Sequence, residues 1–156
     1  MYKFTKGNSL IEVVIAMAII TIILIITVPK LNDFRDNQTL KNTTADVVSL
    51  INEAKTNTLS SKNGSVHGVH FETDRMVLFE GGTYDSSSVN NKKVLFDPLV
   101  TLPWSNIVIN GNGNEIIFDR LTGNTNNYGT ITLELSGDST IKKVITVSAL
   151  GIISSN

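Results

Sequence analysis

The stretch GNSLIEVVIAMAIITIILIITVP, residues 7–29, decides the fold of this chain. From Leu10 to Val28 it is almost wholly aliphatic, and its single charge is Glu12. A helix needs about 20 apolar residues to cross a bilayer, so this run is long enough to do so. Its aliphatic residues together favour insertion by about 4–8 kcal/mol, against about 3 kcal/mol for one central charge. We therefore expect a single-pass membrane helix that keeps one carboxylate near its start.

The composition of the whole chain narrows the class of protein. The chain has 156 residues and a net charge of −1, which suits one small domain and does not favour nucleic acid as a partner. It contains no cysteine, so disulfides and thiol chemistry are excluded. After Val28 it is rich in Asn, Thr, Ser and Gly, which indicates a β-rich domain outside the cytoplasm.

Two simple explanations of the apolar run are incomplete. A secretory signal peptide has a shorter apolar core, about 7–15 residues, and ends at a small-residue cleavage site. The run here is longer, holds a glutamate and leads into Thr27-Val28-Pro29 without such a site. A plain single-pass anchor explains the hydrophobicity but gives no reason for Glu12.

The spacing of Lys6-Gly7, Glu12 and Pro29 resembles the type IV prepilin signature. In that family a membrane peptidase cuts after the glycine and methylates the new amino terminus. The resemblance implies that residues 1–7 are a cytoplasmic leader, and that Asn8 becomes the N-methylated first residue. Asn8 stands where the family usually has phenylalanine. The resemblance also implies that Pro29 bends the helix.

Glu12 gains a physical role from this resemblance. An ionisable group inside a membrane segment usually has a partner and a function. The amine freed at Asn8 lies one helical turn from Glu12. In a filament, the resemblance implies, Glu12 pairs with the terminal amine of a neighbouring subunit and fixes the axial register, as a buried polar group does in a coiled coil. The simpler interpretation is an interfacial glutamate whose carboxylate reaches the head groups.

Beyond Pro29 the apolar residues recur at helical spacing, with regular steps of three and four from Val47. We expect an amphipathic helix over residues 30–63, following the assembly helix of residues 8–29. The apolar stripe that packs on a sheet consists of Val47, Val48, Ile51 and Ala54. The polar residues 36–44 predict a looser stretch, and Pro29 predicts a kink rather than a stop. Asn63-Gly64 predicts the helix end.

Residues 64–156 have the alternation of β-strands and form the predicted extracytoplasmic domain. The expected strands are 66–71, 76–80, 94–96, 107–109, 115–118, 129–135, 141–147 and 151–153. The first two predict a hairpin, and Asn110 to Asn114 is a strong turn signal between 107–109 and 115–118. An antiparallel sheet or β-sandwich packed on the long helix makes the expected fold α+β, as in pilins.

The carboxy-terminal half also resembles a known family. The residues that carry this resemblance are Phe118–Gly123, Gly129–Leu133, Ile145–Val147 and Gly151–Ser154. They are similar to the end of minor pseudopilins of the GspH/FimT type, whose β-sandwiches follow the same long helix. Some members carry arginines after the last glycine and are linked to DNA uptake. Ile152 and Ile153 occupy that stretch here, so the resemblance does not extend to DNA binding.

Catalytic and metal-binding patterns are not evident in the sequence. His67 and His70 face opposite sides of a strand and lack a further ligand. The loop aspartates lack the spacing of a calcium motif and are typical of turns. No nucleophile elbow or phosphate loop is present, so we expect no enzyme, cofactor or metal site. Trp104 is compatible both with capping the sheet and with contacting a partner.

The sequence thus predicts a structural subunit, a minor pilin or pseudopilin of a type IV pilus, a type II secretion system or a DNA-uptake filament. The partners that the resemblance implies are other pilins or pseudopilins, the prepilin peptidase and methylase, an inner-membrane assembly platform with its ATPase, and the lipid bilayer. The implied location is the inner membrane and then a periplasmic or surface filament. The alternative is a membrane-anchored binding module that does not polymerise, and a membrane-tethered enzyme is a third hypothesis.

Overall fold

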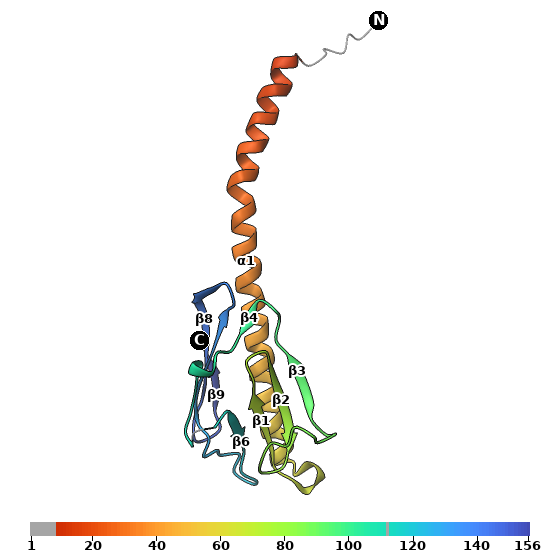
Figure 1. Cartoon of the computed structure of the whole chain (residues 1–156), viewed down its shortest axis with the longest axis vertical. Helices are drawn as coiled ribbons and strands as arrows, with labels where there is room; N and C mark the ends of the chain where they lie inside the picture. The colour runs from red at the N-terminus through yellow and green to blue at the C-terminus, as the bar shows by residue number, and fades with distance from the viewer. Residues whose placement is uncertain (1–8, 112) are drawn as a thin grey trace, which may run out of the picture. The chain divides into compact units, whose positions relative to one another are not determined.

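The computed structural model describes residues 9–111 and 113–156, without the side chains of residues 26–30. The chain divides into two compact units, residues 1–35 and 36–156. Helix α1, Leu10–Leu59, contributes to both, and it continues through Pro29 rather than stopping there (Figure 1). The expected long helix is therefore present, and a kink at Pro29 stays a prediction.

The polar residues 36–44 are helical, so the looser stretch expected there is wrong. The reason is tertiary packing. Leu40 is 1% exposed, and Thr43 and Thr44 are also buried. The Thr44 hydroxyl donates to the Leu40 carbonyl oxygen at 2.7 Å, so this buried polar group is satisfied within the helix.

Helix α1 ends at Leu59, earlier than the Asn63-Gly64 signal predicts. Ser61 takes the left-handed conformation, with φ 51°, and the residues after it form the short 3-10 helix η1, Lys62–Gly64. Thr58 anchors this end, because its hydroxyl oxygen accepts the His67 N–H at 2.8 Å. The helix therefore stops where its last buried turn is tied to the first strand.

In the part of the chain that the structure describes, nine strands form two antiparallel sheets. The first sheet has the order β3 (Lys92–Leu95), β2 (Arg75–Glu80), β1 (His67–Phe71) and β6 (Glu115–Ile117). The second has the order β4 (Val100–Thr101), β7 (Gly129–Leu135), β8 (Asp138–Val147) and β9 (Ile153–Ser155), with β5 (Ile107–Ile109) also paired to β7. The second 3-10 helix, η2 (Trp104–Asn106), precedes β5. The expected α+β class is confirmed.

The turn between β5 and β6 does not make a hairpin. The expected hairpin of β1 and β2 is present, with Val69 opposite Leu78. In contrast, β5 pairs with β7 and β6 pairs with β1, so the two strands that flank residues 110–114 belong to different sheets. Gly129 permits the β5 pairing, because a Cβ at this position would overlap the Val108 carbonyl oxygen. Long-range partners therefore outweigh the local turn signal.

One hydrophobic core joins both sheets to the second half of α1. The predicted stripe is confirmed, since Val47, Ile51 and Ala54 are 0% exposed and Val48 packs against the same core. The sequence pattern missed Leu50, which is also buried. The sheets contribute the buried side chains of Val69, Phe71, Ile116, Ile131, Leu133 and Ile145, and Phe118, which follows β6, is buried with them. Each such side chain stabilises the fold by about 1.5–3 kcal/mol through removal from water.

Candidate assembly segment

The first turns of α1 display apolar side chains on every side. Every described side chain from Leu10 to Ile25 is exposed. Among the large apolar side chains, the exposed fractions run from 47% at Val13 to 83% at Leu10. Even four successive residues, Ile22, Ile23, Leu24 and Ile25, are each more than half exposed. A helix that is hydrophobic all round is normally surrounded by protein or lipid. We call residues 10–25 the assembly segment.

Polar groups in the assembly segment are few and largely satisfied within the helix. The Thr21 hydroxyl donates to the Met17 carbonyl oxygen at 2.8 Å. Ser9 begins the helix, because its carbonyl oxygen accepts the N–H groups of Glu12 at 2.9 Å and Val13 at 3.3 Å. Glu12 lies in the first turn, where the partial positive charge of the helix end favours a carboxylate. Its side chain is exposed, so it is available to a group outside this segment.

The remaining predicted site residues are only partly described. Gly7 and Asn8, the predicted cleavage and methylation residues, lie outside the described residues. Pro29 lies within α1, and its side chain is not described. Within the part of the chain that the structure describes, none of the helices is both long and apolar enough to cross a membrane. The single-pass span is therefore not confirmed.

A junction beside Lys55 joins two stretches that carry the resemblance in the carboxy-terminal half. The Lys55 ammonium donates to the Gly151 carbonyl oxygen at 2.8 Å. Gly123 and Gly151 are both left-handed, with φ 68°, and a Cβ at Gly151 would overlap the Gly123 carbonyl oxygen. The two glycines let both loops approach the helix closely. The sequence pattern includes both glycines but gives no signal for Lys55, because its role depends on the two loops that meet it.

The two histidines have different surroundings, as their opposite strand faces predict. His70 lies 3.0 Å from Glu115, measured from Nδ1 to Oε1, and its ring stacks on Tyr84 with centroids 3.9 Å apart. The Asn114 amide lies 3.2 Å from the other ring nitrogen, Nε2. His67 is only 4% exposed, and burial lowers its pKa below the ordinary value. Over residues 9–111 and 113–156, no three His, Asp or Glu side chains gather as metal ligands do.

The loop aspartates hold turns together. The Asp85 carboxylate accepts both the N–H and the hydroxyl of Ser87, at 2.9 and 2.7 Å. Asp138 accepts the same two groups from Thr140, at 2.9 and 2.6 Å. These bonds lower the pKa of each carboxyl below its usual range. The geometry is that of turns in which an aspartate caps the backbone two residues ahead.

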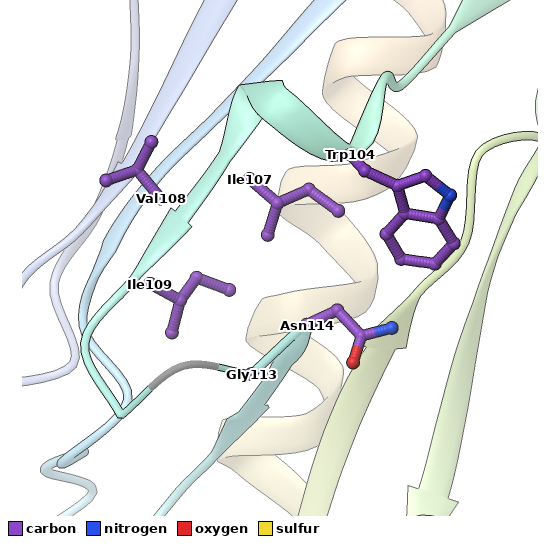
Figure 2. Close-up of a pocket in the computed structure, with 6 residues that line it drawn as sticks. All are labelled: Trp104, Ile107, Val108, Ile109, Gly113 and Asn114. Carbon is purple, nitrogen blue, oxygen red and sulfur yellow. The ribbon is translucent and has the colours of Figure 1, made fainter.

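Trp104 lies at a hollow of the β-domain. It belongs to η2, directly after Pro103, and is 57% exposed. The hollow holds about 560 Å³ and is lined by Trp104, Ile107, Val108, Ile109, Gly113 and Asn114. Figure 2 shows Ile107 and Ile109 on one side of β5, toward Trp104 and Asn114, and Val108 on the other. More than half of the tryptophan side chain is therefore open to solvent.

Comparison with known proteins bears on the amino-terminal part of the chain. Residues 3–28 match the family model described as the prokaryotic N-terminal methylation motif. No curated protein and no solved structure gives a significant match. The motif supports the type IV pilin and pseudopilin family, whose members are structural and interact with other pilins and with prepilin peptidase. The chain thus carries, over its apolar amino-terminal stretch, the methylation motif of type IV pilin-like proteins.

Proposed function

We propose that this protein is a structural subunit of a type IV filament, and that it assembles through residues 8–29. The observation that supports this most is the assembly segment, whose apolar side chains are exposed around the whole helix. Burying one such side chain is favourable by about 1.5–3 kcal/mol. These side chains therefore stay out of water in both states, in lipid before assembly and against neighbouring helices in the filament, where close van der Waals packing holds the helices together. Head-to-tail contacts of this kind do not close, so they produce open helical fibres.

Processing prepares the chain for assembly. A prepilin peptidase cuts between Gly7 and Asn8, removes the leader of residues 1–7 and methylates the Asn8 amine. The methylation motif over residues 3–28 supports this step, because it includes both residues. The new amine then lies one helical turn before Glu12, close to the carboxylate in sequence but free to meet a neighbouring subunit.

Glu12 sets the register between subunits. Its carboxylate is the only charge from Leu10 to Pro29. A carboxylate packed among aliphatic helices needs a positive partner, because an unpaired buried charge is strongly destabilising. The methylated amine of the next subunit provides that partner at one axial position only. The aliphatic surface thus supplies affinity, and Glu12 supplies the register.

The rest of the chain fits the same role. Residues 8–29 hold the subunit in the membrane as a single-pass helix before assembly, residues 30–63 connect them to the domain, and residues 64–156 form the extracytoplasmic β-domain. The arrangement of a long helix with antiparallel sheets supports a pilin-like subunit. The Gly123–Gly151 junction supports a minor pseudopilin of the GspH/FimT type, because it unites two of the stretches that resemble that group.

Amino-terminal mass analysis of the protein from its native host tests this function. The expected result is a chain that begins at Asn8 and carries one methyl group on its amine. A second sample from cells that lack the prepilin peptidase should retain Met1. A mature protein that keeps Met1 in peptidase-containing cells would contradict the proposal and favour the membrane-anchored binding module.

A further inference from the structure

Strand β5 leaves one edge of the second sheet open. The strand pairs with β7 on one side only, with Ile109 opposite Gly129. The next pair along the ladder is hydrogen bonded, because the Asn110 N–H donates to the Tyr128 carbonyl oxygen at 2.8 Å. Hydrogen-bonded and non-bonded pairs alternate in an antiparallel ladder. The N–H and C=O of Ile109 therefore point away from β7.

The open edge runs along the hollow beside Trp104. All three residues of β5 line this hollow, although their side chains alternate between the two faces of the sheet (Figure 2). Because the hollow is lined by residues from both faces of the sheet, it lies along the edge of the strand. At the start of β5 the Ile107 N–H already donates to the Trp104 carbonyl oxygen. Among the described residues, no backbone bond reaches the Ile109 N–H.

Two other sheet edges carry polar or charged residues, as natural proteins commonly arrange to prevent edge-to-edge pairing. Lys92 and Lys93 lie in β3, one edge of the first sheet, and Ser154 and Ser155 lie in β9, the far edge of the second. In contrast, β5 reads Ile-Val-Ile, and none of the six residues that line the hollow is charged. The β5 edge lacks the polar and charged residues that protect the β3 and β9 edges.

We propose that the β5 edge binds an extended, uncharged aliphatic segment of another polypeptide by strand addition. The backbone of the guest segment pairs with the Ile109 N–H and C=O and with the Ile107 carbonyl oxygen. Its alternate side chains enter the hollow between Ile107, Ile109 and Trp104. A charged guest side chain is excluded there, because the lining offers it no ionic partner. This interaction is independent of the filament role of residues 8–29.

The probe for this site is a short capped peptide of alternating threonine and valine, added to the full chain in neutral detergent micelles. Trp104 is the sole tryptophan of the chain, so its emission should shift to shorter wavelength as the peptide covers it. Hydrogen exchange at the Ile109 amide should slow roughly tenfold when the peptide is at about ten times its Kd. A peptide with N-methylated valines has the same side chains but cannot complete the ladder, and it should produce neither effect.

Two lysine variants locate the contact. Ile107→Lys places a charge in the hollow and should abolish the emission shift. Val89→Lys places the same charge at a residue that is 97% exposed and does not line the hollow, and it should leave the shift intact. Thermal unfolding followed by circular dichroism checks that both variants fold. If Ile107→Lys does not fold, the comparison of the two peptides on the unaltered chain still tests the proposal. An equal response to the N-methylated peptide, or an Ile109 amide already protected without peptide, overturns the proposal.

Discussion

The two halves of helix α1 use similar aliphatic residues in opposite ways. In residues 10–25 the apolar side chains surround the helix and are exposed. In the second half they form one stripe, and Val47, Ile51 and Ala54 are wholly buried in the core. An amphipathic helix finds its partner on one side, whereas a helix that is apolar all round needs partners on all sides. The second half has its partner within the chain, and our account places the partners of the first half outside it.

The largest expected effect follows from replacing Glu12, the one charged residue within residues 10–25. Glu12→Val should reduce entry into filaments by at least roughly tenfold, because it leaves the neighbour's amine without its partner. Removing one member of a buried pair costs about 3–5 kcal/mol, and each 1.4 kcal/mol is about tenfold. The measurement is the amount of subunit in purified filaments relative to the amount in membranes.

Glu53→Val is the matched control in the second half of the same helix. Glu53 lies 2.7 Å from Lys92 in a partly exposed ion pair. Such pairs contribute little to stability, so the loss of Glu53 should change the amount of subunit in filaments only slightly. A Glu12→Val subunit that enters filaments as readily as the Glu53→Val subunit would remove the pairing argument.

The next effect separates stability from assembly. Ile51→Ala should lower the free energy of unfolding by about 2–5 kcal/mol, because it leaves a cavity in the core. Ile20→Ala replaces a side chain that is 56% exposed, so it should change the free energy of unfolding by less than about 0.5 kcal/mol. Urea titration of the full chain in micelles measures both values. Equal losses for the two variants would mean that the first half also packs within the chain.

A smaller effect concerns the loop junction beside Lys55. Gly151→Ala should destabilise the β-domain by about 1–3 kcal/mol, because the residue is left-handed and a Cβ would overlap the Gly123 carbonyl oxygen. Gly137→Ala is the control, since its Cβ would meet no atom within 4 Å. Melting temperatures of the two variants provide the comparison, and similar values would show that the junction tolerates a side chain.

The smallest expected effect concerns the pH dependence of the free energy of unfolding. Burial lowers the pKa of His67 from its ordinary 6.5, so the unfolded chain binds the proton at a higher pH than the folded one. Stability should therefore fall as pH decreases below 6.5, through the range down to the lowered pKa. His67→Gln should flatten this part of the stability profile, measured by urea titration at several pH values. An unchanged slope would show that His67 does not contribute to it.

The sequence predicted the features that depend on local pattern. Helical spacing identified the buried stripe from Val47 to Ala54, and strand alternation identified β1, β2 and β7. Each of these signals lies within a few residues, so it can be read without knowing the partners. The prepilin-like spacing of Gly7 and Glu12 is also local, and the methylation motif matches the region that holds it.

Features that depend on distant partners were not predictable in this way. The turn at residues 110–114 indicated neighbouring strands, but β7 and β1 provide stronger pairing for β5 and β6. The polar residues 36–44 indicated a loose helix, but burial of Leu40 and Thr44 keeps it regular. Lys55 gives no sequence signal, because its role depends on the carbonyl oxygen of Gly151, which follows it by more than half the chain.

Photo-cross-linking within assembled filaments tests the central claim most directly. A photoreactive residue placed at Ile20 should cross-link to other pilin-like subunits, because our account surrounds this position with neighbouring helices. The same residue placed at Ile51, which is buried in the core, should form only links within its own chain. If the probe at Ile20 reacts only with lipid or within its own chain while filaments are present, the account is contradicted.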